Sequence, residues 1–395
     1  MYIQCTQAVL KKLGLEATQV KKGSEVEEKD DFYSFHVHTI RVGRKSVVVC
    51  MNNLTTYPLI FTNVKKKDYQ DLGRLIVSNL RYMLLLSGIT KEKVNQYCSH
   101  LGEVQYTTTN RKYLAKLKDY CERLKYYPHL LEEDYVFQTK LTKYLARSGM
   151  ILKNHFYYPE VEMLQALAMM NGLPSADLDT IQQIENYEFK ISMQLENHEI
   201  YRKVLVPIST NFDDFHDVIQ IAFDWFNYHS YEYEIPNENN TNKRYFDIPR
   251  KEFSYGICHP VNIDSEFDKL AKFEYKSSID LKLKDIFEHK TTIFYLYDLG
   301  DCWVHTITLE KKVKCANSYP RVLEGKGNRP PEDVGGEGGY EEFLKITSDP
   351  KNPDYERLNA WATEQNPKEM NLVRINSTIR NCLYESVESI YGRRF

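Results

Sequence analysis

The sequence predicts an α+β protein built from two α+β domains joined by a helical segment. Three observations lead to this prediction. The chain has 395 residues, more than one hydrophobic core usually organises. Strand-like runs and stretches of helical periodicity occur in both halves. They do not follow one another in regular strand–helix–strand order, so a parallel α/β sheet is not expected. We place the segments at residues 1–125, 126–184 and 185–395.

Composition indicates a soluble globular protein. Hydrophobic residues make up 42% and charged residues 27% of the chain, and the net charge of -3 does not indicate nucleic-acid binding, although local basic surfaces remain open. The eight cysteines form no CxxC pair and no signal-like segment begins the chain, so we expect reduced thiols and a cytoplasmic location. The most apolar helical stretch, residues 72–86, is too short for a bilayer, and no membrane contact is expected.

The first domain should begin with a helix and continue with strands. Thr6 can cap a helix that ends at Gly14. Alternating or continuous apolar runs then predict strands in residues 35–42, 46–52 and 57–64, followed by an amphipathic helix from Asp68. In residues 126–184, Tyr-rich and Leu-rich patches alternate with charges, and we interpret this stretch as a helical connection.

The second domain should begin near Glu185 with a strand over residues 187–197. A helix is predicted over residues 213–226, with Thr210 as its cap and Asp213 completing a capping box. Further elements are a strand at 229–235, a short helix at 283–287, a hairpin at 294–305, a Pro/Gly loop at 329–340, a helix opening near Tyr340 and a closing helix at 371–391.

The hairpin FYLYDLGDCWVH and the loop RPPEDVGGEGGY carry the strongest indication of a site. The hairpin turn contains two aspartates, and two acids follow Pro330 and Pro331, which stiffen the loop. Such residue types build metal sites and acid–base sites. We predict that turn and loop meet, and that the candidate catalytic residues are Asp298, Asp301, His305, Glu332 and Asp333. The four carboxylates among them would also be the ligands of any metal ion.

Each of these residues also has a structural interpretation. A tight turn needs Gly and Asp in any case, and the loop acids could cap amides of the glycine pairs. His305 shares a strand face with Trp303 and Ile307, so it could pack at the edge of the core. Three acids in one loop would repel phosphate unless a cation lay between them. The residues that we consider for ligand contact are His216, His229, Tyr297, Trp303, Gly335, Gly336 and Tyr340.

A basic stripe is predicted in the first domain. Arg111, Lys118 and Lys125 recur every seven residues and would share one helix face. Such a face could contact nucleic-acid phosphates, and it could equally be an ordinary solvated surface.

Three segments of the second domain resemble the plasmid pRi ORF-3-like family: VLVPISTNFDDFHDVIQIAFDWFNYHSYEYEI, FYLYDLGDCWVHTITLE and YPRVLEGKGNRPPEDVGGEGGYEEFLKI. The resemblance covers roughly residues 185–375 and rests on YDxGDxWxH occurring together with PPEDxGGxxGY. Family members are labelled insertion-element passenger proteins or putative resolvases, but no Ser or Tyr here is singled out as a recombinase nucleophile. In the N-terminal half, MYIQCTQAVLKKLGL, GRKSVVVCMNNLTTYPLIF and TTNRKYLAKLKD resemble a bacterial domain of unknown function.

The resemblance also bears on metals. Many family members place cysteines at positions that match Val322, Arg329 and Val334 here, and a Cys-rich loop would imply a thiolate zinc site. Because this chain lacks those cysteines, a structural zinc ion is not expected. A metal ion at this loop would be an oxygen-bound one such as Mg²⁺ or Mn²⁺.

Three functions remain open from the sequence. The first is a binding protein of mobile-element or phage–plasmid conflict context, with a polar groove between turn and loop that contacts a nucleotide or nucleic acid. The second is a divalent-metal-dependent hydrolase of phosphoesters or nucleic acid, in which His305 or His229 moves protons. The third is an inhibitor or scaffold that binds a host or phage protein and no small molecule.

Overall fold

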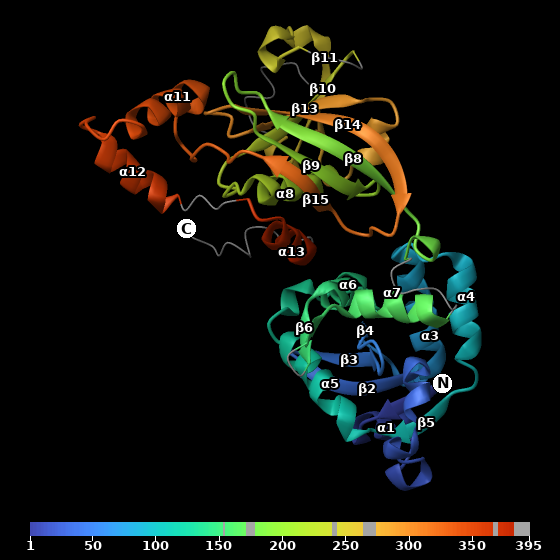
Figure 1. Cartoon of the computed structure of the whole chain (residues 1–395). Helices are drawn as coiled ribbons and strands as arrows, with labels where there is room; N and C mark the ends of the chain where they lie inside the picture. The colour runs from blue at the N-terminus through green and yellow to red at the C-terminus, as the bar shows by residue number, and fades with distance from the viewer. Residues whose placement is uncertain (153–154, 171–177, 239–242, 264–273, 366–369, 383–395) are drawn as a thin grey trace. The chain divides into compact units, whose positions relative to one another are not determined.

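The computed structural model describes residues 1–152, 155–170, 178–238, 243–263, 274–365 and 370–382 (Figure 1). The chain divides into two compact units, Met1–Ile184 and Glu185–Phe395. Both contain helices and sheets, so the predicted α+β class is confirmed. Among the described residues, no helix is long and apolar enough to cross a membrane.

The N-terminal unit is organised around a five-stranded sheet of order β4-β3-β2-β1-β5. The predicted strands are β2, β3 and β4, which pair in antiparallel fashion. The sequence did not predict β1 or β5, because four residues each are too few to show a periodicity. β1 lies between β2 and β5 and is parallel to both. The strand bounds are β1 (Tyr2–Cys5), β2 (Ser34–Val42), β3 (Lys45–Asn52), β4 (Pro58–Thr62) and β5 (Gln105–Thr108).

Helices pack against this sheet and complete the N-terminal core. Two of these helices, α6 (Thr139–Arg147) and α7 (Pro159–Met170), come from residues 126–184, which we interpret from the sequence as a connection. Ala146, Met163 and Leu167 from these two helices are buried in the same cluster as Ile3 and Leu72. The α-helices and further strands of the unit are α1 (Gln7–Leu13), α2 (Lys66–Gln70), α3 (Leu72–Leu86), α4 (Lys91–His100), α5 (Arg111–Arg123), α6 (Thr139–Arg147), β6 (Met150–Leu152), β7 (His155–Tyr157) and α7 (Pro159–Met170).

The C-terminal unit contains an eight-stranded sheet of order β12-β11-β10-β13-β14-β8-β9-β15. The predicted hairpin is β13 and β14, which pair from Thr292 with Thr308 to Tyr297 with Trp303. The strand bounds are β8 (Ile184–Met193), β9 (Tyr201–Pro207), β10 (Tyr231–Pro236), β11 (Phe253–Cys258), β12 (Tyr275–Ser277), β13 (Thr292–Tyr297), β14 (Trp303–Cys315) and β15 (Arg321–Lys326).

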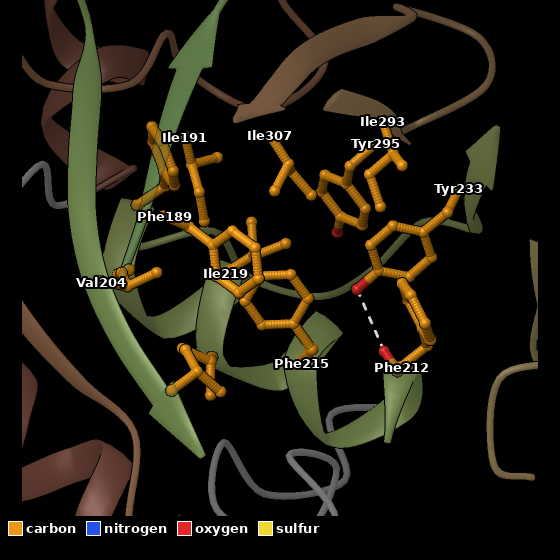
Figure 2. Packing of buried hydrophobic residues seen from close by; sticks show 14 of the residues in the cluster. Phe189, Ile191, Val204, Phe212, Phe215, Ile219, Tyr233, Ile293, Tyr295 and Ile307 are labelled. Carbon is orange, nitrogen blue, oxygen red and sulfur yellow. Dashed lines mark hydrogen bonds between the residues drawn. The ribbon is translucent and has the colours of Figure 1, made fainter. Parts of the chain in front are cut away.

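Helix α8 (Phe212–Phe223) buries its apolar stripe in the core of this unit. Phe215 and Ile219 of the helix face Phe189, Val204 and Ile307 of the sheet (Figure 2). The sheet and helix are also joined by a hydrogen bond of 3.0 Å from the Tyr233 hydroxyl to the Phe212 carbonyl, drawn as a dashed line in Figure 2. The core is therefore a helix-on-sheet layer rich in aromatic rings.

The ends of α8 differ from the sequence prediction. The cap is Asn211 and not Thr210, because the Asn211 side chain accepts the Asp214 N–H at 2.7 Å. The helix ends at Phe223, since Asp224 adopts a left-handed conformation with φ of 66°. Trp225 and Phe226, which continue the apolar pattern, therefore lie in the loop that leads to β10.

The other helices of this unit are α10 (Leu283–Phe287), α11 (Gly336–Thr347), α12 (Tyr355–Glu364) and α13 (Leu372–Cys382). Helix α11 begins at Gly336, earlier than the predicted start near Tyr340. Ile375 and Ile379 of α13 are buried in the core. Residues 383–391 of the predicted closing helix lie outside the described residues.

Candidate functional site

The turn between β13 and β14 and the loop before α11 contact each other. The Gly335 N–H donates to Asp301 Oδ2 at 3.0 Å, and the Tyr297 hydroxyl donates to Glu332 Oε1 at 3.3 Å. At Gly336 the backbones approach so closely that an added Cβ would lie 2.8 Å from the Asp301 carbonyl oxygen. A glycine is thus required where the loop passes over the turn.

Four ionisable side chains converge beside this contact; we call His229, Asp298, Glu332 and Asp333 the acidic–histidine cluster. His229 Nε2 lies 3.1 Å from Asp333 Oδ1, 3.6 Å from Asp298 Oδ2 and 3.9 Å from Glu332 Oε2. One ligand atom from each of His229, Asp298 and Asp333 lies within 4.8 Å of the other two. Three separate chain segments therefore meet at one histidine nitrogen.

Asp298 is fixed by the turn that it opens. Its backbone is left-handed, with φ of 52°, and its Oδ1 accepts the N–H groups of Gly300 at 3.0 Å and Asp301 at 3.3 Å. Asp and Asn tolerate this conformation because their side chains bond nearby amides. Since Oδ1 serves the turn, Oδ2 is the oxygen that faces His229.

Glu332 is the buried member of the cluster, with a side chain 1% exposed. Its Oε1 accepts the Phe226 N–H at 2.7 Å in addition to the Tyr297 hydroxyl. Its Oε2 is buried and has no hydrogen-bond donor among the described residues. Burial raises the pKa of the Glu332 carboxyl, and the bond from Phe226 N–H opposes this shift. An unpaired buried carboxylate oxygen is costly, so it calls for a proton or a cation.

The cluster is open to solvent on one side. The side chains of Asp333 and His229 are 65% and 28% exposed, whereas Asp298 is largely buried. The His229 ring packs edge-on against the Tyr297 ring, with centroids 5.9 Å apart. A ligand from solvent can therefore reach Asp333 first, and the buried Nε2 of His229 and the Glu332 carboxylate lie behind it.

Two other predicted residues of the hairpin do not join the cluster. Asp301 bonds the Gly335 amide, which is a structural role. His305 is fully buried, its Nδ1 lies 3.0 Å from the Trp303 carbonyl, and its ring packs on Phe223 and Tyr295. Burial lowers the pKa of His305 to about 4. His305 is thus a core histidine in this structure, not a neighbour of the turn carboxylates.

Some of the residues predicted for ligand contact lie in the core, and others lie at the acidic–histidine cluster. Trp303 and His216 are buried in the core, and the His216 ring stacks on Tyr231 with centroids 3.6 Å apart. Tyr340 packs against the core and against the ring of His198. Tyr297 is buried but touches the cluster through its hydroxyl, and Gly335 and Gly336 shape the loop. Of this set, only His229 belongs to the acidic–histidine cluster itself.

The basic stripe of the N-terminal unit is interrupted by acidic residues. Arg111 and Lys118 are exposed on α5, but Lys125 lies beyond the helix end and pairs with Glu122 at 2.8 Å. Asp119 on the same helix pairs with Arg123 at 2.8 Å. The positive electrostatic potential at this helix face is therefore weaker than the spacing of the basic residues alone predicts, and it would attract phosphate less.

The C-terminal unit is thus an α+β unit with an acidic–histidine cluster where a hairpin turn meets a Pro/Gly loop. The family model described as plasmid pRiA4b ORF-3-like protein matches residues 185–374. A model described as a domain of unknown function, DUF6933, matches residues 2–162. Both predicted resemblances are confirmed.

Two individual proteins are similar to part of the chain. The protein is 28% identical over 175 residues to "Uncharacterized protein y4hQ" of Sinorhizobium fredii, an alignment that covers 44% of this chain and 78% of the relative. It is also 28% identical to a solved structure, the "Protein of Unknown Function MM3350" of Methanosarcina mazei Go1. That match has a TM-score of 0.39 and covers 48% of this chain and 97% of the other. The names of these relatives state no activity.

Proposed function

We propose that the C-terminal unit is a binding module of mobile-element context that holds a phosphate-bearing ligand, a nucleotide or a nucleic-acid strand, at the acidic–histidine cluster. One observation carries this proposal: the ligand atoms of His229, Asp298 and Asp333 lie within 4.8 Å of one another, and the Asp333 side chain among them is exposed to solvent. Rigid loops that present polar groups in this way are typical of binding sites.

The charge of the cluster restricts how such a ligand binds. Three carboxylates surround one imidazole, so an anionic phosphate meets repulsion if it approaches directly. A bridging cation removes that repulsion and links phosphate oxygens to the carboxylates. The proposal is therefore one of cation-assisted binding.

Fluorescence anisotropy on the full chain tests the proposal, with labelled nucleoside mono-, di- and triphosphates and 20-nucleotide single-stranded DNA and RNA as probes. The double variant His229→Ala/Asp333→Ala should bind at least about tenfold more weakly, because two charged contacts are lost. The double variant His289→Ala/Asp349→Ala removes the same residue types at exposed positions and should bind as the wild type does. Equal affinity in the two double variants, or no binding of any probe, would contradict the proposal.

A second candidate is divalent-dependent phosphoester hydrolysis, and the position of Glu332 favours it. This buried carboxyl has a raised pKa and lies 3.9 Å from the partly exposed His229, and carboxyl and imidazole groups in such different environments can divide acid and base roles. The test is release of p-nitrophenol from bis(p-nitrophenyl) phosphate with Mn²⁺ or Mg²⁺. The expected result is turnover by the wild type and at least about 100-fold less by Glu332→Gln. Absence of divalent-dependent turnover removes this candidate.

Nucleic-acid contact by the N-terminal unit stays a separate proposal. The exposure of Arg111 and Lys118 supports it, and the acidic residues on α5 weaken it. A host or phage protein as partner is the remaining alternative, and co-purification of the full chain with such a protein would support it.

A further inference from the structure

We infer that the acidic–histidine cluster is a binding site for a divalent first-row transition ion of the Mn²⁺ or Zn²⁺ kind. His229, Asp298 and Asp333 would be its ligands, and Glu332 would complete the set. This inference rests on the proposed function in using the same surface, and it names the cation through which that surface would bind phosphate. The sequence predicts a different metal set, which includes Asp301 and lacks His229.

The spacing of the candidate ligand atoms suits a metal ion. Bonds of about 2.0–2.2 Å to nitrogen and oxygen place neighbouring ligand atoms about 3.0–3.6 Å apart in octahedral or tetrahedral geometry. His229 Nε2 lies 3.1, 3.6 and 3.9 Å from the carboxylate oxygens of Asp333, Asp298 and Glu332. The ligand atoms of His229, Asp298 and Asp333 lie within 4.8 Å of one another, so local side-chain shifts would bring these three to one ion. Glu332 lies outside that group and would have to move farther to join them.

Two of the carboxylates are oriented by protein donors, each through one oxygen only. The Gly300 and Asp301 amides hold Asp298 Oδ1, and the Phe226 amide and the Tyr297 hydroxyl hold Glu332 Oε1. In both residues the second oxygen is the one that faces His229. Such outer hydrogen bonds are the usual means by which proteins aim metal ligands.

The unpaired oxygen of Glu332 is the independent sign that a ligand belongs here. The side chain is 1% exposed, and Oε2 has no hydrogen-bond donor among the described residues. His229 Nε2, which it approaches, is likewise buried and without a hydrogen bond in the part of the chain that the structure describes. One cation would satisfy both the Glu332 oxygen, which has no hydrogen bond, and the His229 nitrogen, which lies near three carboxylates without a hydrogen bond to any of them.

The donor set also selects the kind of ion. Carboxylates alone suit Mg²⁺, Ca²⁺ and Mn²⁺, whereas imidazole suits Zn²⁺ and other late first-row ions. A set of one imidazole with up to three carboxylates therefore favours Mn²⁺ or Zn²⁺ over Mg²⁺. Asp333 lies on the open side, so the ion would keep a coordination position for water or phosphate there.

Isothermal titration calorimetry tests the inference, with the full chain freed of metal by chelator and titrated with MnCl₂, ZnCl₂ and MgCl₂. The wild type should bind one Mn²⁺ or Zn²⁺ ion at least tenfold more tightly than Mg²⁺. His229→Ala should weaken that binding at least tenfold, and Glu332→Gln, which keeps the oxygen that Phe226 and Tyr297 hold, should do so as well. His289→Ala is the matched control and should leave the affinity unchanged.

Crystals soaked in MnCl₂ should show an anomalous peak within about 2.5 Å of His229 Nε2 and of carboxylate oxygens of the cluster. Asp333→Asn is an exposed, nearly isosteric change, so a loss of binding in this variant cannot come from misfolding. Absence of Mn²⁺ and Zn²⁺ binding, or equal affinity in His229→Ala and His289→Ala, overturns the inference.

The same variants separate this inference from the proposed function. Nucleotide binding that persists in chelator and still depends on His229 and Asp333 overturns the cation site and leaves the binding module standing. One Mn²⁺ or Zn²⁺ ion bound at the cluster, with no affinity for any phosphate-bearing probe, supports the cation site and overturns the binding module.

Discussion

Left-handed backbone conformations concentrate around the acidic–histidine cluster. Among the described residues, seven residues other than glycine have a positive φ, and five of them lie in the segments that meet there: Asp224, Asn227, Asp298, Cys302 and Asp333. Each such conformation costs of order 1 kcal/mol in an ordinary residue. The tertiary contacts between turn and loop must offset that cost, so the local geometry of the cluster depends on them.

Substitution of Asp298 separates its role in the turn from its charge. Asp298→Ala loses the acceptor for the Gly300 and Asp301 amides and tolerates the left-handed backbone less well. We expect it to lower the free energy of unfolding by about 2–3 kcal/mol. Asp298→Asn keeps both features and should cost less than about 1 kcal/mol. Urea unfolding in chelator at pH 7.5 measures both variants, and equal losses would show that the side-chain acceptor does not support the turn.

His216 is held neutral by a buried chain of hydrogen bonds. Gln220 Nε2 donates to the Tyr295 hydroxyl, which lies 2.8 Å from His216 Nδ1, and His216 Nε2 lies 2.8 Å from Asn227 Oδ1. Burial lowers the pKa of His216 to about 4, and the bond to Asn227 opposes that shift. The neutral ring suits this chain, because Nδ1 must accept the tyrosine proton.

The depressed pKa predicts acid sensitivity. This histidine titrates near 4 in the folded chain and near 6.5 in the unfolded chain. Its contribution to the free energy of unfolding is therefore fully present above pH 6.5. That contribution falls by up to about 1.4 kcal/mol per pH unit as the pH drops from 6.5 to 4. Urea unfolding from pH 7.5 to 4.5 should show this slope added to that of His305, whose pKa burial also lowers to about 4. His216→Gln should reduce the combined slope although it lowers stability at pH 7.5. An unchanged slope in the variant would assign the acid sensitivity to other groups.

The acids of the cluster could be found from the sequence, whereas the histidine could be chosen only from the structure. Asp298, Glu332 and Asp333 stand beside Gly and Pro in short motifs, and this context marks them as rigid loop residues. His229 and His305 both lie in predicted strand segments, and alternation alone does not tell which one is close to the turn. Tertiary structure decides, since His305 points into the aromatic core and His229 precedes β10 at the rim.

At the level of elements, Arg202 on β9 ties the end of α8 to the segment that follows β15. Its guanidinium donates to the Ala222 carbonyl at 2.8 Å, to the Lys326 carbonyl at 3.0 Å and to the Gly327 carbonyl at 2.9 Å. The side chain is buried, and burial lowers its pKa to about 10. A cation at the C-terminal end of a helix also interacts favourably with the helix dipole.

Replacement of Arg202 should loosen this junction. Arg202→Lys keeps the charge but cannot supply the planar fork that reaches carbonyls of several segments. We expect a loss of about 2–4 kcal/mol in the free energy of unfolding, because buried carbonyl groups lose their donors. The control is Lys203→Arg, the reverse exchange at the next position, where the lysine pairs with Glu310 near the surface. Its free energy of unfolding should stay within about 0.5 kcal/mol of the wild-type value. Chemical unfolding monitored by tryptophan fluorescence compares them.

The sequence predicts the long helices and strands with a clear apolar periodicity, and it does not predict the shortest strands. The stripe of α8 and the alternation of β2 and β8 identify these elements from the sequence alone. β1, β5 and β12 have three or four residues each, and their place in the sheet comes from pairing with distant segments. The start of α11 at Gly336 is also set by the turn–loop contact, because Asp301 fixes the preceding amide of Gly335.

At the level of the whole chain, each of the two units has a large hydrophobic core cluster of its own. The N-terminal core cluster runs from Ile3 to Ile181, and the C-terminal cluster runs from Tyr187 to Ile379. The clusters have no residue in common, and two different family models match residues 2–162 and 185–374. Each unit of about 200 residues is large enough to bury a core of its own.

The two units should therefore fold as separate polypeptides. We expect residues 1–184 and residues 185–395 each to unfold cooperatively, as circular dichroism during heating would show, because neither core needs side chains of the other. All members of the acidic–histidine cluster lie in the second polypeptide, so calorimetry should find Mn²⁺ or Zn²⁺ affinity there within about threefold of the full chain, and none in the first polypeptide. A second polypeptide that melts without cooperativity would show that its core depends on the N-terminal unit. One that folds but has lost the affinity would show that residues 1–184 contribute to the cation site.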